Sequence, residues 1–213
     1  MKESERKYIN GLISHTKDSI KFFSNSMKPE RERCVCAAFL RCLGIDFSVN
    51  GIIAQKPDPP DVIFASAKFE IIELYEDGRR RHDEYRKRLD DLKKAKSMEG
   101  ALIRIKWPIP ISYDKLFTGI KQALNEKAER YGKNLCSSLD VLVYVSLPQR
   151  FLDINSDPAK FDEIMAQGWR SVSFVIPPYS HVVYCKENAP TFLSAFSGKT
   201  RIEWKAPDTF FEL

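Results

Sequence analysis

The chain begins with two segments in which apolar residues return every three or four positions, the spacing of an amphipathic helix. In the first segment the apolar stripe comprises Ile9, Leu12, Ile13, Thr16, Ile20 and Phe23. In the second it comprises Val35, Ala38, Phe39 and Cys42. Because the second segment follows Pro29 and stops at Gly44, both of its ends carry helix-boundary signals. Glu32 shares this second stripe, so its carboxylate lies at the edge of the buried face.

After Gly44 the pattern changes to the alternation of β-strands, at residues 45–49 and, beyond the breaker KPDPP, at 61–64 and 68–74. The three residues between the last two runs suit a hairpin. A basic segment at about 79–97 and a further segment at about 112–131 are predicted to be helices.

Two apolar runs near the end of the chain, 139–147 and 171–176, are typical of interior strands. A helix predicted over 158–167, capped by Asp157 and ended by Gly168, connects them and predicts parallel pairing. The whole pattern therefore predicts an α/β fold in which a mixed central sheet is flanked by helices.

The composition permits one domain over residues 1–213, because 213 residues with 43% hydrophobic and 30% charged residues can bury one substantial core. Within it we expect an N-terminal helix at 1–26, a core at 29–147 and a C-terminal β-α-β addition at 148–213. No window approaches the roughly 18 apolar residues of a membrane span, and the start MKESERKYIN has no apolar signal-peptide core. We expect a cytoplasmic protein.

Cysteine usage agrees with that location. The five cysteines cannot all pair, so we expect them to be reduced and buried: Cys34, Cys36, Cys42, Cys136 and Cys185. The C-x-C spacing and three scattered histidines do not suit a zinc site. One of those histidines, His181, lies between Tyr179 and Tyr184 and is either a structural residue or part of a site.

Two carboxylates interrupt the β-prone stretch PPDVIFASAKFEII at 59–72. Alternation places Lys68, Glu70 and Ile72 on one strand face. A tight hairpin brings Asp61 and Glu70 together near one sheet edge, where two carboxylates repel each other and lose solvation. Mg²⁺ compensates such a pair. The alternative is that both acids are solvated at a sheet edge and that Asp61 closes a turn.

Basic residues are concentrated in one predicted helix. Residues 79–98 hold nine Lys and Arg against four Asp and Glu, a surplus of +5 that equals the formal net charge of the whole chain. The segment opens with Arg79, Arg80 and Arg81, and such a surface suits contact with a polyanion. The alternative is a solvated face with acid-to-base pairs at i, i+4, as at 83 and 87, 84 and 88, and 90 and 94.

Three stretches together resemble a known superfamily: ERERCVC at 30–36, PPDVIF at 59–64 and FEIIELYEDGRR at 69–80. The order of a helix with an acid, a strand with Pro-Asp, a hairpin and a strand with an acid is similar to the restriction-endonuclease-like PD-(D/E)XK superfamily. More narrowly, the stretches resemble a family of bacterial proteins described as candidate endonucleases. The narrower likeness covers about 30–85 well and the remainder mainly in its order of elements.

The resemblance implies Mg²⁺-dependent (or Mn²⁺-dependent) hydrolysis of nucleic-acid phosphodiester bonds. By position, Asp61 and Glu70 would hold the metal, and Glu32 would orient a metal-bound water. The superfamily's lysine follows the strand acid by two residues, but this chain has Ile72 there. Lys68 shares the face of Glu70 and is the substitute catalytic residue that we expect.

A rival hypothesis is a non-catalytic nucleic-acid-binding or adaptor protein that kept the fold after losing the lysine. DNA and RNA remain equally open as partners, and a homodimer is open too, because neither is readable from one chain. The easily read nucleotide-binding and hydrolase motifs, such as G-x-x-x-x-G-K-[ST] and G-x-S-x-G, are absent from the sequence.

Overall fold

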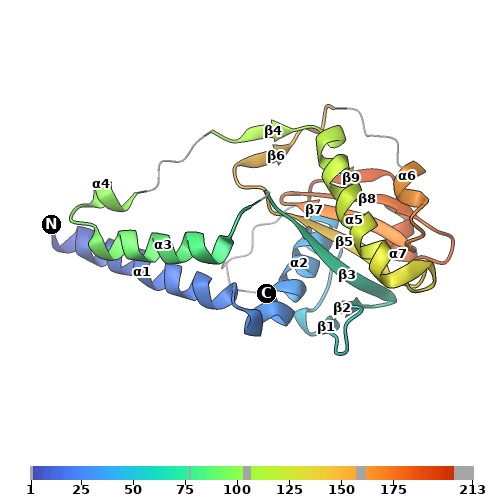
Figure 1. Cartoon of the computed structure of the whole chain (residues 1–213), viewed down its shortest axis with the longest axis horizontal. Coiled ribbons are helices and arrows are strands. Elements are labelled where there is room, and N and C mark those ends of the chain that lie inside the picture. The colour runs from blue at the N-terminus through green and yellow to red at the C-terminus, as the bar shows by residue number, and fades with distance from the viewer. Residues whose placement is uncertain (1, 77, 103–106, 157–161, 204–213) are drawn as a thin grey trace. The chain divides into compact units, whose positions relative to one another are not determined.

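The computed structural model describes residues 2–76, 78–102, 107–156 and 162–203 (Figure 1). The chain groups into two compact units. A helical unit comprises Met1–Arg31 and Asp77–Trp107, and a sheet unit comprises Glu32–Glu76 and Pro108–Leu213. The expectation of a single domain stays a prediction.

The helical unit is built on α1 (Glu3–Phe22) and α3 (Arg81–Lys94), which lie side by side, with the short α4 (Met98–Ala101) following. A 3₁₀ turn, Asn25–Met27, follows α1. Its small core consists of Ile9, Leu92 and Ala101, with Leu12, Ile13 and Ala95 packed around them. Both helices were predicted from their apolar spacing, and the structure confirms them.

The sheet unit contains a seven-stranded mixed sheet in the order β1-β2-β3-β5-β7-β8-β9. Its strands are β1 (Ile52–Ala54), β2 (Val62–Phe64), β3 (Ala67–Leu74), β5 (Asp140–Val145), β7 (Ser171–Ile176), β8 (Tyr179–Cys185) and β9 (Lys199–Arg201). The central strands β3, β5 and β7 run parallel, and the outer neighbours pair antiparallel. A separate parallel pair joins β4 (Ile109–Ile111) to β6 (Arg150–Leu152).

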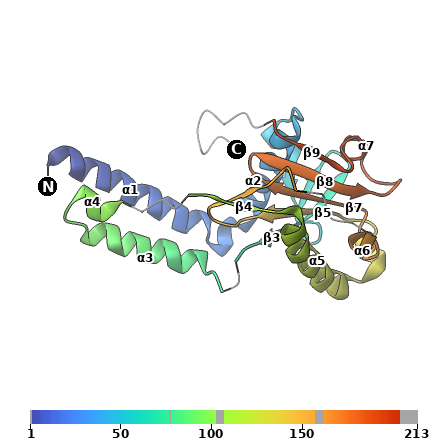
Figure 2. The ribbon, with the colours of Figure 1, turned by 90° about the horizontal axis from the view of Figure 1, so that it is seen from above.

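Two helices cover the two faces of this sheet. Helix α5 (Tyr113–Cys136) packs on one face, and α2 (Lys28–Leu43) packs on the other. Figure 2 shows α5 and α2 on opposite sides of the strands. Two single turns, α6 (Asp162–Met165) and α7 (Thr191–Ser194), and a 3₁₀ turn at Val49–Gly51 complete the described elements. The predicted α/β fold with a mixed, helix-flanked sheet is confirmed.

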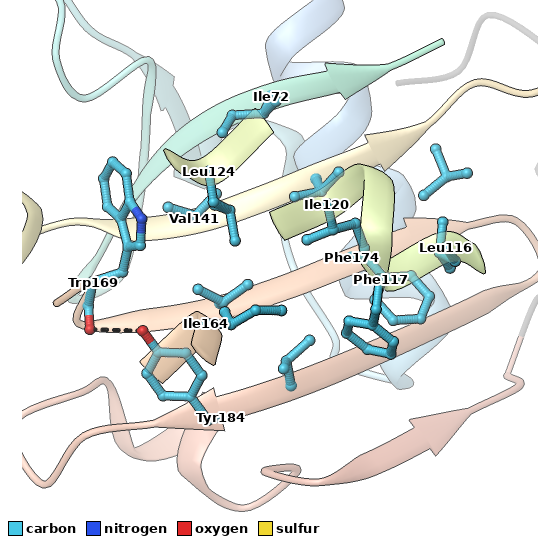
Figure 3. Packing of buried hydrophobic residues seen from close by; sticks show 14 of the residues in the cluster. Ile72, Leu116, Phe117, Ile120, Leu124, Val141, Ile164, Trp169, Phe174 and Tyr184 are labelled. Atoms are coloured by element: carbon cyan, nitrogen blue, oxygen red, sulfur yellow. Dashed lines mark hydrogen bonds between the residues drawn. The ribbon is translucent and has the colours of Figure 1, made fainter. Parts of the chain in front are cut away.

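The core under α5 is formed by large side chains from helix and sheet (Figure 3). Leu116, Ile120 and Leu124 are fully buried on α5 and meet Phe174 and Ile72 from the strands. Removing each such side chain from water contributes about 1.5–3 kcal/mol. Helix α5 also approaches β3 closely, since a Cβ on Gly119 would lie 3.2 Å from a Leu74 methyl carbon.

A buried carboxylate fixes the starting ends of the parallel strands. Asp140, on β5, is fully buried and accepts hydrogen bonds from the Lys68 amide (2.9 Å), the Arg170 Nε (3.0 Å) and the Ser171 hydroxyl (2.7 Å). Its Oδ2 also pairs with the Arg170 Nη2. Both oxygens are therefore satisfied, and the residue ties β3 and β7 to β5.

The strands predicted at 61–64, 68–74, 139–147 and 171–176 are confirmed to within two residues. The strand predicted at 45–49 is wrong, because the first strand begins only at Ile52. Ile45 and Phe47 do pack against the core under α2, so their alternation reflects one-sided burial without a neighbouring strand. For the helix predicted over 158–167, residues 158–161 lie outside the described residues, and α6 covers part of the remainder.

None of the helices in the described part of the chain combines the length and apolar character needed to cross a membrane.

His181 is buried on β8 within an aromatic cluster. Its ring stacks on Phe174 at a centroid distance of 5.2 Å and lies 5.6 Å from the Tyr113 ring, and its Nδ1 lies 2.8 Å from the Thr200 hydroxyl. Burial lowers the pKa of His181 to about 4, because the charged imidazolium loses its hydration there.

This burial predicts a stability change below neutral pH. Above pH 6.5 the imidazole is neutral in both states; as the pH falls toward 4, only the unfolded chain takes up the proton. The free energy of unfolding should therefore decrease, by about 3 kcal/mol in total at 1.36 kcal/mol per pKa unit. Urea unfolding of wild type and His181→Phe at pH 7.5, 6, 5 and 4 measures the contribution of His181 to this pH dependence, as the difference between the two proteins. Identical pH slopes in the two proteins would contradict it.

Candidate functional site

The β2–β3 hairpin brings the two predicted acids together. Val62 pairs with Phe69 in this hairpin, so continuing the register by one residue places Asp61 opposite Glu70. The Asp61 amide donates to the Phe69 carbonyl (3.0 Å), and the Ile71 amide donates to Asp61 Oδ2 (2.8 Å). The carboxylate thus takes the place of a backbone acceptor, which fixes its orientation.

Three carboxylates converge at this point. Asp58, Asp61 and Glu70 each offer an oxygen, and these oxygens all lie within 4.8 Å of one another. Asp61 is 3% exposed and Glu70 is 0% exposed, whereas Asp58 is exposed. The hairpin therefore brings Asp61 and Glu70 together, as its spacing predicted, and the proline-flanked loop before it adds a third acid, Asp58.

Helix α5 supplies two partners for Glu70. The Lys127 ammonium forms an ion pair with Glu70 Oε1, and the Tyr131 hydroxyl donates to the same oxygen at 2.9 Å. The second oxygen, Oε2, is buried and has no hydrogen-bond partner among the residues that the structure describes. Leaving a buried acceptor without a partner costs about 1–3 kcal/mol, and more when the acceptor is charged. Glu70, a member of the acidic group, thus has one buried oxygen without a hydrogen-bond donor among the described residues.

The electrostatics of the group suit a doubly charged cation. Asp58, Asp61, Glu70 and Lys127 together carry a formal charge of −2. The pKa of Tyr131 is raised, first by burial and then by the negative charge of Asp58, so its phenol keeps the proton that it donates to Glu70. The negative charge of the acidic group therefore favours the protonated form of Tyr131 and would favour a bound cation.

A Mg²⁺ ion fits this donor set. The ion prefers carboxylate oxygens at about 2.1 Å, so two bonded oxygens lie at most about 4.2 Å apart. The 4.8 Å limit on the separations of the three oxygens is close to that value. Asp61 and Glu70 are the residues positioned to hold the ion, with Asp58 as a third, exposed donor.

The structure also locates the remaining residues expected around the acids. Ile72, where the resemblance to the PD-(D/E)XK superfamily would place a lysine, is buried under α5. Lys68 is exposed, and its backbone amide bonds to Asp140. Glu32 is half-buried on α2, which covers the sheet face opposite α5, and it does not belong to the group of three carboxylates. Catalytic roles for Lys68 and Glu32 stay predictions.

The arginines predicted to contact nucleic acid belong to the helical unit. Arg79 pairs with Glu84 (Nε to Oε1, 3.0 Å), and the Arg81 guanidinium lies 4.4 Å from the centre of the Phe23 ring. Arg80 is exposed just before α3. Their role in binding also stays a prediction, and two of the three have structural partners.

Sequence reasoning missed Lys127, Tyr131 and Asp58. A signal for the first two was present, because they continue the stripe of Ile120 and Leu124 at helical spacing, so a lysine and a tyrosine stand where apolar residues are expected. Asp58 lies only three residues before Asp61, between Pro57 and Pro59, and could have been read as part of the same acidic group.

The comparisons with known proteins concern the family and the fold of the chain. The chain is similar to a solved structure from Pseudomonas aeruginosa strain PAO1, a protein of unknown function described as belonging to the monooxygenase superfamily, with 27% sequence identity and a TM-score of 0.65. The match covers 95% of this chain and 96% of that one. None of the curated proteins compared matches the chain.

A family model matches residues 4–205, nearly the whole chain. Its description is "putative endonuclease, protein of unknown function (DUF1780)". The chain therefore belongs to this DUF1780 family.

Proposed function

We propose that this protein is a Mg²⁺-dependent or Mn²⁺-dependent nuclease of the PD-(D/E)XK type that hydrolyses phosphodiester bonds of nucleic acid. The observation that carries the proposal is the buried pair Asp61 and Glu70, with an unpartnered Glu70 oxygen and the Lys127 ammonium beside them. The family's description as endonuclease supports it.

Each residue has a distinct part in the proposed reaction. When bound, the divalent ion supplies a water of lowered pKa and positive charge for the phosphate oxygens. Asp61 and Glu70 hold that ion, with Asp61 oriented by the Ile71 amide. Tyr131 fixes Glu70 through its hydroxyl. Lys127 takes the place of the strand lysine, where it can assist proton transfer from water or neutralise developing negative charge.

Lys127 also bears on the rival hypothesis of a non-catalytic adaptor. That hypothesis was motivated by Ile72 at the lysine position, but helix α5 brings another lysine to the same carboxylate. The candidate ligands Asp58, Asp61 and Glu70 are carboxylates, which suit Mg²⁺ and the metal-assisted hydrolysis of phosphodiester bonds. They therefore favour the nuclease over the monooxygenase class named for the Pseudomonas protein.

Removing either buried acid should abolish cleavage. Asp61→Asn and Glu70→Gln each keep the side-chain shape but lose a charged ligand, so Mg²⁺ binding by calorimetry should disappear, and nuclease activity with Mn²⁺ should fall at least about a hundredfold. The assay uses mixed DNA and RNA with the wild type in EDTA as a blank.

The matched controls are Asp46→Asn and Glu187→Gln, which remove exposed acids from the same unit. Both should bind metal and cleave like the wild type. Cleavage that persists in folded Glu70→Gln, or wild-type protein that takes up no metal, would refute the nuclease proposal; nucleic-acid binding that is unchanged in EDTA with no cleavage would instead indicate the adaptor.

The two lysine candidates can be separated by arginine substitution. Lys127→Arg keeps a positive charge beside Glu70, so the protein should stay folded, but guanidinium does not readily accept or release a proton. Cleavage should therefore fall about a hundredfold or more, the usual contribution of a general acid or base. Lys68→Arg should stay within about threefold of wild type. The opposite result, measured as kcat at saturating Mn²⁺ with thermal unfolding as the folding check, would assign the role to Lys68.

A further inference from the structure

The two units of the chain carry opposite formal charge. The helical unit contains 18 Lys and Arg against 10 Asp and Glu, a formal charge of +8. The sheet unit contains 16 basic and 19 acidic residues, a formal charge of −3. The unit that holds the acidic site is therefore poorly suited to attract a polyanion by itself, while the helical unit is strongly suited to it.

The exposed surface of α1 and α3 is mostly polar, because most apolar residues of the two helices pack in the unit's core, although Tyr8 on α1 is exposed, as are Leu102 and Trp107 after α4. Ile9 on α1 and Leu92 on α3 are buried against each other's helix in the unit's core. At the end of this core, Phe23 stacks on Tyr85 with ring centres 5.3 Å apart. What remains outside on both helices is dominated by charged side chains.

Structural partners decide which basic residues are available to a ligand. Arg79 is engaged by Glu84, and Arg88 donates to the Ala101 carbonyl. Lys93 approaches Asp90 at 4.0 Å. The exposed basic side chains of α3 outside these contacts are Arg86, Lys87 and Lys94. These three differ from the arginine triplet that the sequence suggested.

We propose that the helical unit of α1 and α3 binds the phosphate backbone of duplex DNA through exposed basic residues that include Arg86, Lys87 and Lys94. The inference rests on the proposed function for the identity of the polyanion. Helix α1, with 20 residues, is about 30 Å long, a length comparable to about nine base pairs at 3.4 Å each. Contacts of this kind need no base recognition and depend strongly on salt.

Two features favour a duplex over other polyanions. Proteins that grip single strands stack successive bases on several exposed aromatic rings. On α1 and α3, Phe22 and Tyr85 pack with Phe23, which leaves Tyr8 as the exposed aromatic ring of the two helices. Helices that bind anionic membranes need an apolar face for the lipid, and the apolar faces of α1 and α3 are already buried in the unit's core.

The test measures binding without catalysis. Full-length protein in EDTA is titrated into a fluorescent 24-base-pair DNA duplex at several salt concentrations. The triple variant Arg86→Ala, Lys87→Ala, Lys94→Ala should bind more than about tenfold more weakly at 100 mM salt, and the slope of log affinity against log salt should become shallower by about 2 to 3, near 0.9 per lost contact.

The matched control removes the same charge from the sheet unit, through Lys115→Ala, Lys133→Ala and Lys199→Ala, which are all exposed. It should bind nearly like the wild type. Equal losses in the two triple variants, or tighter binding to a single strand or to phosphatidylserine vesicles than to the duplex, would overturn the proposal. Because no metal is present, a binding loss confined to the helical variant supports this proposal even if the sheet unit cleaves nothing. Unchanged duplex binding by the helical variant, together with Mn²⁺-dependent cleavage, would overturn this proposal and keep the nuclease proposal.

Discussion

The contact between Glu70 and Lys127 is the interaction on which the candidate site depends. Glu70 is fully buried under α5, and taking a carboxylate out of water costs several kcal/mol unless charge and hydrogen bonds compensate. Lys127 and Tyr131 compensate one of its oxygens. They can do so only while α5 lies close to β3, an approach that Gly119 permits beside Leu74. The packing of helix on sheet and the presence of a charged strand residue therefore support each other.

Asp140 shows what a purely structural carboxylate looks like in the same sheet. It is as deeply buried as Glu70, yet both of its oxygens accept hydrogen bonds, from a guanidinium, a hydroxyl and an amide. Glu70 has partners on Oε1, while its buried Oε2 has no hydrogen bond among the described residues, and the Glu70 carboxylate is grouped with two further acids. Burial alone does not distinguish a ligand from a structural residue. What sets Glu70 apart is the combination of an unsatisfied oxygen with two neighbouring acids, because a cation there would offset both the missing hydrogen bond and the repulsion.

The sequence allowed four of the seven strands of the sheet and the pair of acids to be predicted, but not the edge strands β1 and β9, the strand β8 or the groups that surround the acids. Alternation located the hairpin and the strand Ser171–Ile176, and a hairpin register necessarily places Asp61 near Glu70. The same alternation failed at 45–49, since a chain can bury every second residue against a helix without pairing to a strand. Lys127 was missed because 57 residues separate it from Glu70, and only the packing of α5 on the sheet decides which of its side chains reaches the strand acid.

The geometry of the strand face explains why the lysine beside Glu70 comes from α5 and position 72 of β3 is apolar. Ile72 lies on the same face of β3 as Glu70 and is buried together with Leu124 beneath α5 (Figure 3). A lysine at 72 would place its ammonium under the helix that already carries Lys127, and two like charges in a desolvated space destabilise each other. An apolar residue at 72 instead adds to the packing that holds α5 in position. Reaction chemistry depends on where an ammonium lies in space, and α5 places the Lys127 ammonium beside Glu70, so the apolar residue at 72 does not by itself indicate a lost activity.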